Sequence, residues 1–197
     1  MAAKNYDDAA VFIPGRGAVL IAPEGTDAPT ADELTQWVES GATGALGSFL
    51  PLGYTSEDEL PAFEADTDGG ERKGAWENGS LRMTPTKITE SINVTPIQWS
   101  ETPLNHRFGP GTIEDTKGHF VMPRVYTSTK VALLVVIVDG DSAIGIHYFR
   151  TETAPNDSLE LDPEKFAGLP VKYSVLVSTE KGKGTIIASH FKAAAAG

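Results

Sequence analysis

The sequence predicts a mainly β fold, an antiparallel β-sandwich or partial barrel with a short flanking α-helix. Residues 131–138 are uninterruptedly apolar, which is typical of a strand buried on both faces. A turn at residues 139–142 and a returning strand at 143–152 complete a β-hairpin. Residues 171–177 alternate between apolar and polar side chains, the period of a half-buried strand. The 20 glycines and 13 prolines suit a turn-rich β protein.

The N-terminal part of the chain predicts an arm, a strand and a helix. Residues 1–13 are interpreted as an arm, and a short apolar strand at residues 18–22 follows a Pro-Gly-Arg-Gly turn. Thr30 and Glu33 have the spacing of a capping box, which starts a helix. Apolar residues follow at helical spacing, and Gly41 is the expected stop.

Residues 41–79 are expected to form a long acidic loop with one strand near residues 49–54. Seven acidic residues lie between Glu57 and Glu71, with no lysine or arginine among them. A stretch of this length with little structure of its own is usually functional or ordered by a partner. The alternative is a solvated acidic loop without a further role.

Residues 81–99 read as one unusually long strand. One face of its second half is polar and is formed by Lys87, Thr89, Ser91, Asn93 and Thr95. The opposite face carries Ile88, Ile92 and Val94. The apolar phase changes after Pro96, which indicates a bulge or bend there. Such a strand would span roughly 60 Å, against a usual length of about 17–20 Å. It therefore needs cover from outside its own domain, which points to an assembly.

The rest of the chain predicts short helices and further strands. Thr102 is expected to cap a helix with Pro103 at its first position, and Gly109 to end it. Asp162 and Pro163 start a second predicted helical turn. A turn at residues 180–184 leads to a last strand that ends near residue 191, and residues 192–197 form a C-terminal tail. The whole chain, residues 1–197, is interpreted as a single domain.

Composition and motifs favour a protein without catalysis, cofactor or metal. The net charge of −11 predicts repulsion of nucleic acid rather than binding. There is no cysteine, and the four histidines lack ligand spacing. Residues 66–69 begin like a calcium loop but lack its later ligands, and residues 182–185 lack the spacing of a phosphate loop. No apolar run is long enough for a membrane span.

Three stretches of the chain carry a resemblance to a known family. They are the arm and strand at residues 11–23, the segment 52–60 followed by 73–76, and the long strand with the 102–109 helix and the 131–138 strand. In this combination and order, the chain resembles the major tail tube proteins of long-tailed (siphovirus) bacteriophages, particularly those that infect actinobacteria.

The resemblance implies a structural virion protein with a tail tube fold. Six copies would form a ring, strands from all six would complete an inner β-barrel, and rings would stack into the conduit for genome ejection. The implied partners are tape-measure protein in the lumen during assembly, tail terminator and distal tail proteins at the tube ends, and passing double-stranded DNA without specific binding. The implied location is the phage tail, with assembly in the cytoplasm of the bacterial host.

The resemblance also assigns expected roles to individual residues. The polar strand face, Lys87, Thr89, Ser91, Asn93 and Thr95, is expected to face the lumen. The arm and the 41–79 loop are expected to make contacts between rings, through Phe12, Ile13, Tyr54, Leu60 and Phe63. The helix at 102–109 is expected to pack beside the sandwich.

Two other classes of protein remain open from the sequence. One is another ring-forming tube protein, such as a tail terminator or a secretion-system tube. The other is a monomeric β-sandwich binding module for a receptor or carbohydrate. Such a module should show an aromatic platform, but Trp37, Trp76 and Trp99 fall on separate predicted elements.

Overall fold

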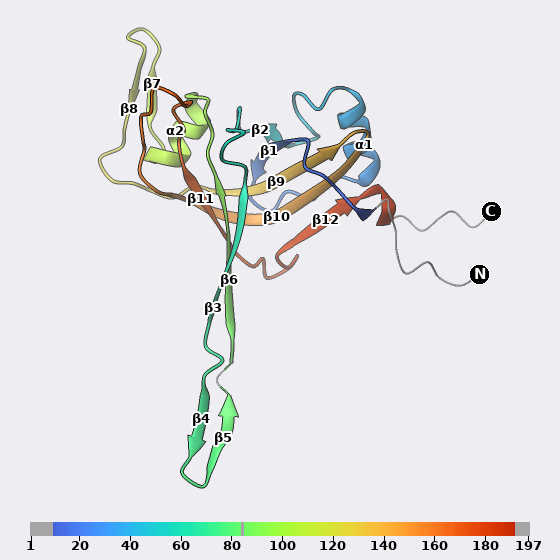
Figure 1. The fold of residues 1–197 in the computed structure, drawn as a ribbon. Helices are drawn as coiled ribbons and strands as arrows, with labels where there is room; N and C mark the ends of the chain where they lie inside the picture. Colours follow the sequence, from blue (N-terminus) through green and yellow to red (C-terminus); the bar gives the residue numbers. More distant parts are fainter. Residues whose placement is uncertain (1–9, 84, 192–197) are drawn as a thin grey trace, which may run out of the picture.

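The computed structural model describes residues 10–83 and 85–191 (Figure 1). Twelve strands, two α-helices and a 3₁₀ turn follow one another along these residues. In chain order they are β1 (Arg16–Pro23), α1 (Ala31–Glu39), β2 (Leu50–Pro51), β3 (Ala62–Asp68), β4 (Arg72–Ala75), β5 (Asn78–Met83), β6 (Lys87–Val94), α2 (Glu101–Phe108), β7 (Thr112–Glu114), β8 (His119–Val121), β9 (Lys130–Asp139), β10 (Ser142–Pro155), β11 (Val171–Val175), β12 (Gly184–Ala188) and the 3₁₀ turn Ser189–Phe191. The predicted mainly β class with short helices is confirmed.

Eight strands form one antiparallel sheet that divides at β10. Its order is β2-β1-β9-β10-β11-β6-β3, and β12 pairs with β10 outside this path. Residues 144–148 of β10 pair with β12, whereas residues 151–155 pair with β11. The register of β10 against β9 shifts between Tyr148 and Thr151, so an irregularity marks the point of division. One long strand therefore supports two branches of the sheet.

Two hydrophobic clusters lie on opposite faces of β1 and β9. The first contains Leu34, Trp37 and Val38 of α1, packed on alternate residues of β1, β9 and β10. The second joins the other residues of β1 and β9 to Ile92 of β6 and Tyr173 of β11. Because β9 is covered on both faces, residues 131–136 are all buried, as their continuous apolar sequence predicts.

Helix α1 forms where its sequence predicts. Thr30 is the N-cap, and its side chain and that of Glu33 each accept a hydrogen bond from the other's backbone N–H. The helix ends at Ser40, and Gly41 follows with a φ of +100°, a conformation that favours glycine. The helix thereby places its one apolar face on the sheet.

The prediction of one continuous strand over residues 81–99 is wrong. The strand is interrupted between β5 and β6, and residues 95–100 separate β6 from α2. Pro85 lies in the first gap and has no N–H to donate. Opposite it, Gly69 has a φ of +93°, and a Cβ there would lie 2.3 Å from the Pro85 carbonyl oxygen. Both strands of the hairpin are therefore broken at the same level.

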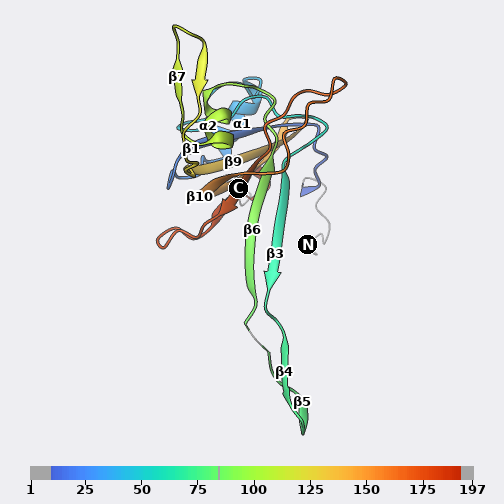
Figure 2. The ribbon, with the colours of Figure 1, turned by 90° about the vertical axis from the view of Figure 1, so that its left-hand side faces the viewer.

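The 41–79 segment has more structure than its sequence suggests. It contains β2, β3, β4 and the start of β5. β3 pairs with β6 in register over seven residues, and β4 pairs with β5 as a separate two-stranded sheet. Strands β3, β4, β5 and β6 together form a long hairpin that extends away from the body of the subunit (Figures 1 and 2).

Two predicted helix boundaries also differ in the structure. Helix α2 begins at Glu101 after Ser100, so Pro103 is its third residue rather than its first. This position is compatible with proline because the first N–H groups of a helix have no partner within the helix. Residues 162–165 form a turn and no second helix, and Phe166 is exposed. A helix there would have had no apolar face to bury.

Candidate functional site

The long hairpin is the most exposed part of the subunit. All seven residues of β3 are exposed, although β3 is paired with β6 along its length. At the tip, between β4 and β5, the Trp76 side chain is fully exposed, at 101% of its reference area. Met83 and Ile88 are also exposed apolar residues on the hairpin. Exposed apolar side chains gathered on one projection are typical of a binding surface.

β3 is also the longest of the three edge strands of the large sheet, which are β3, β2 and the five-residue β12. The opposite edge is β2, which has only two residues. β3 has seven residues and carries four acidic or polar side chains, Glu64, Asp66, Thr67 and Asp68. The outer N–H and C=O groups of a free edge can pair with a strand from another chain. β3 therefore offers a backbone surface as long as an ordinary strand.

The polar face of the β3–β6 pair continues across β11. Asp68 lies opposite Lys87 and Asp66 opposite Thr89. Further along, Glu64 lies opposite Ser91, and its carboxylate is 3.6 Å from the ammonium nitrogen of Lys172 on β11. The face thus combines acidic groups with lysines that already have acidic neighbours.

The five residues predicted to face a lumen differ in their exposure within one subunit. Lys87 and Thr89 are exposed, and Asn93 and Thr95 are half-buried. Ser91 is only 5% exposed, and its hydroxyl lies 3.5 Å from the Glu64 carboxylate. Thr95 lies beyond the end of β6. The other four predicted residues share one face of β6. Ile92, on the opposite face, belongs to the second hydrophobic cluster.

The five residues predicted to contact other rings do not form one patch. Phe12 is half-buried, with its ring centroid 5.8 Å from that of His190. Ile13 is exposed, and its N–H donates to the Asp139 carboxylate. The other three are exposed: Phe63 lies in β3, Leu60 lies just before it, and Tyr54 lies between β2 and β3, where its carbonyl accepts from the Ile97 N–H. Residues 1–9 of the arm and the 192–197 tail lie outside the described residues.

Helix α2 packs against β10 and holds the ends of a long loop at residues 156–170. The Arg107 guanidinium donates to the carbonyl oxygens of Asn156 and Asp157 at the start of the loop. It also donates to the Pro170 carbonyl at the end of the loop, at 2.8 Å. A single arginine in a short helix gives no pattern that predicts this role, and sequence reasoning missed it.

The same helix carries a buried histidine. His106 Nδ1 lies 2.9 Å from the Tyr173 hydroxyl, and both side chains are buried. Burial lowers the pKa of His106 to about 4, because the charged ring would lose its hydration. Burial likewise raises the pKa of Tyr173. Both groups are neutral near pH 7, so the pair acts as a structural contact between α2 and β11.

Neither a cluster of metal-ligating side chains nor a membrane-spanning helix occurs among the described residues. Over residues 10–83 and 85–191, no group of three or more histidine, aspartate and glutamate side chains is placed to hold a metal ion. Within the same residues, no helix has the length and apolar character needed to cross a membrane. The notable features of this part of the chain are its exposed hairpin, free edge and long loop.

The comparisons with known proteins agree with an assembly role. The family described as "Phage tail tube protein" matches residues 3–197. The chain is 34% identical to the "Major tail protein Gp23" of Mycobacterium phage D29 over 174 residues, which is 86% of each chain. It is 33% identical to the protein of the same name from Mycobacterium phage L5 over 175 residues, again 86% of each chain. The chain therefore belongs to the phage tail tube protein family and is a structural component of the phage tail, not an enzyme.

Proposed function

We propose that six copies of this chain close into a ring and that rings stack into the tail tube, the conduit for genome ejection. The observation that carries this proposal is the free β3 edge. An exposed seven-residue edge strand is prone to uncontrolled aggregation unless it is covered or paired. Pairing of β3 with a strand of the neighbouring subunit would remove that edge and would complete an inner β-barrel shared by all six subunits.

The polar face of β3, β6 and β11 would line the bore. Its lysines have acidic neighbours, Lys172 beside Glu64 and Lys87 opposite Asp68. A wall with unpaired basic groups would bind DNA phosphates and slow ejection, whereas this surface offers few such groups. The bore would thus pass double-stranded DNA without specific binding, and would hold tape-measure protein during assembly. Tail terminator and distal tail proteins would close the two ends.

Electron microscopy of the purified protein at high concentration tests the proposal. We expect rings or tubes of uniform bore. Monomers that persist under all conditions would contradict both ring closure and stacking. A tail terminator would give single rings that do not stack, so the length of the particles also separates these two assignments.

Proline substitution tests the role of the β3 edge. Along an edge strand, successive N–H groups point alternately towards the paired strand and away from it. Ala65→Pro and Asp66→Pro therefore form a matched pair. One of these two substitutions removes an N–H group that donates to β6, and it lowers the stability of the hairpin. The other leaves the subunit folded and blocks pairing with a neighbour. If both variants fold and form rings as the unmodified protein does, β3 is not the ring interface.

A further inference from the structure

We propose that the tip of the hairpin docks on the loop at residues 156–170 of a second copy. We call residues 71–83 the basic tip and residues 156–170 the acidic loop. This inference rests on the proposed stacking of rings and names the two surfaces that meet. The two segments lie at opposite ends of the subunit: the hairpin extends downwards in Figures 1 and 2, and the acidic loop lies on the upper side of the body in both views.

The two surfaces have opposite charge. The basic tip has three bases, Arg72, Lys73 and Arg82, against two acids, which gives +1 in a chain of net charge −11. The acidic loop has four acids, Asp157, Glu160, Asp162 and Glu164, against one base, which gives −3. Complementary charges of this kind favour association and fix which surfaces meet.

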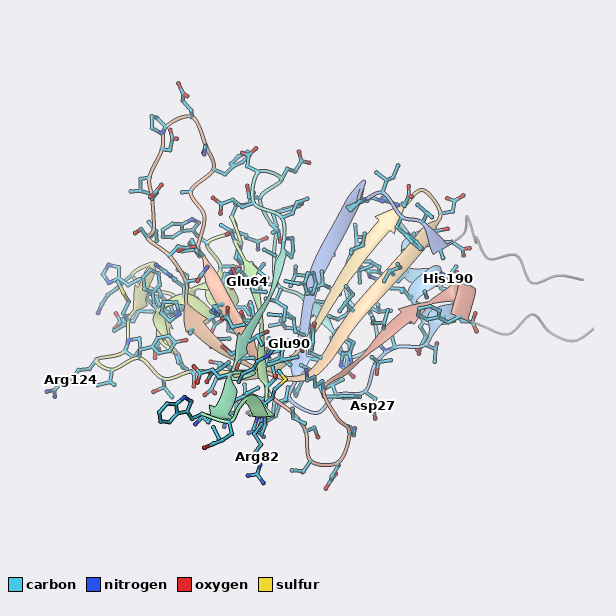
Figure 3. All side chains as sticks on the ribbon, turned by 60° about the horizontal axis from the view of Figure 1, so that its bottom comes forward. Asp27, Glu64, Arg82, Glu90, Arg124 and His190 are labelled. Carbon is cyan, nitrogen blue, oxygen red and sulfur yellow. The ribbon has the colours of Figure 1, made fainter. Side chains whose placement is uncertain are left out.

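The charges of the basic tip are unbalanced within the subunit. Lys73 and Arg82 lie directly opposite each other in the β4–β5 pair. Like charges at such positions destabilise a strand pair. Acidic groups supplied by another copy would remove this repulsion. The Arg82 side chain points away from the body, as Figure 3 shows.

Both surfaces also present large exposed apolar side chains. Trp76 lies at the end of the basic tip. In the acidic loop, Leu161 is 74% and Phe166 77% exposed. An exposed aromatic side chain on a surface of net positive charge, facing apolar groups on a surface of net negative charge, is a suitable centre for an interface.

The acidic loop is held in place before docking. Arg107 fixes its two ends. The Trp99 indole N–H donates to the Ala167 carbonyl at 2.9 Å, and the Leu169 N–H donates to the Pro96 carbonyl at 2.8 Å. A surface that is ordered before binding loses less conformational entropy when it binds. Helix α2 therefore acts as a positioning element for the acidic loop.

An interface between two different surfaces of identical chains can repeat without limit. Such head-to-tail contacts form open stacks when the operation that relates the copies does not close on itself. The basic tip and the acidic loop, at opposite ends of the subunit, meet this condition along the direction of the hairpin. Contacts within one ring would instead use the β3 edge.

Charge reversal tests the docking. We expect Lys73→Glu/Arg82→Glu and Glu160→Lys/Glu164→Lys each to abolish tubes while leaving rings, as seen by electron microscopy. Combining all four substitutions should restore tubes. Glu39→Lys/Glu180→Lys makes the same change in net charge as Glu160→Lys/Glu164→Lys, but on α1 and in the β11–β12 turn, and should leave tubes intact. Circular dichroism checks that each variant is folded.

The outcomes separate this inference from the proposed function. If the unmodified protein forms no tubes, the proposed function is wrong. If the reversed variants stack normally, or if the combined variant remains in rings, the pairing of these two surfaces is wrong while tube formation stands.

Crosslinking gives a second measurement that does not depend on the charge variants. The natural chain has no cysteine, so Glu77→Cys/Lys165→Cys introduces the only thiols. A short bifunctional thiol reagent should join successive copies in assembled tubes into a ladder of covalent oligomers. Glu77→Cys/Glu39→Cys is the control and should give no ladder. Tubes of the first variant that remain uncrosslinked would overturn the docking.

Discussion

At the residue scale, two buried histidines connect the subunit's stability to pH. His106 lies beside Tyr173, and His147 lies between Phe49 and Phe149 in edge-to-face contacts. Burial lowers the pKa of each histidine from 6.5 to about 4. For His147 the nearby Asp27 carboxylate opposes this effect and the Lys181 ammonium adds to it. Both rings are neutral in the folded subunit at pH 7.

We expect the free energy of unfolding to fall as the pH drops from 6.5 to 4. In this range the unfolded chain binds protons that the folded chain does not, so acid favours unfolding. The slope from each histidine is at most about 1.4 kcal/mol per pH unit. Urea titrations of the dilute subunit at several pH values give the free energy of unfolding at each pH. We expect this free energy to depend less steeply on pH for His106→Gln than for the unmodified protein. His119→Gln, on an exposed side chain of β8, should leave the slope unchanged. Equal slopes for all three proteins would show that His106 does not contribute.

The sequence predicts the structural role of a residue where a local pattern of neighbouring residues determines that role. Thr30, Glu33 and Gly41 occupy their predicted places because a helix end is set by a few neighbouring residues. The roles of His106 and Arg107 depend on partners 67 and 49 to 63 residues away in the chain. No spacing within the sequence records those contacts. Helix α2 follows Ser100 rather than Thr102, and no side-chain cap hydrogen bond marks its start.

At the element scale, the break in the hairpin depends on one glycine. Gly69 has a φ of +93°, and a Cβ there would meet the Pro85 carbonyl oxygen. We expect Gly69→Ala to change the angle between the β4–β5 tip and the β3–β6 stem, since a left-handed alanine costs about 1–2 kcal/mol and the contact adds to it. The thermal midpoint of the subunit should stay the same, because β4 and β5 form a separate sheet.

The measurement for this variant is tube formation beside thermal unfolding. Tubes should be fewer or shorter for Gly69→Ala. Gly182→Ala, outside the hairpin, is the matched control, because Gly182 also has a positive φ, +81°, and nothing lies within 4 Å of a Cβ at that position. If Gly69→Ala assembles as well as the control, the direction of the tip is not set at this break.

Strands were predictable at this scale when they bury one or both faces. β9 and β11 show the expected apolar patterns because the clusters on their faces require them. β3 could not be recognised, because all of its residues are exposed and no apolar period marks a strand without a buried face. The break within residues 81–99 could not be recognised for a different reason. The alternation of apolar and polar residues there reflects which side chains are buried, whereas the break at Pro85 interrupts the backbone hydrogen bonds.

At the scale of the whole molecule, the described part of the N-terminal arm, residues 10–13, lies outside the hydrophobic core. Among the described residues, the two hydrophobic clusters contain none before Ala18. The described end of the arm is held by few contacts, among them the hydrogen bond from Ile13 to Asp139 and the Phe12–His190 ring contact. Val11 and Ile13 are exposed, as expected for residues that bind another copy.

Deletion of residues 1–13 should therefore leave a folded monomer that cannot polymerise. Circular dichroism and thermal unfolding should match those of the full chain, while analytical ultracentrifugation should show no large assemblies. Phe12→Ala, which removes only the contact with His190, is the milder companion variant. Unimpaired tube formation by the truncated chain would show that the arm does not link subunits.

The pairing of β6 with β11, which attaches the hairpin to the body, has a mechanical consequence for the proposed stack of rings. A pull on the hairpin tip acts along β3 and β6, parallel to the strands. The ladder between β6 and β11, four residue pairs long, joins the hairpin to the body and is then loaded in shear. Hydrogen bonds in a sheared ladder share the load and must break together, whereas bonds pulled open from one end break in sequence. Tension in a long tail would thus pass from ring to ring through the strongest direction of each sheet.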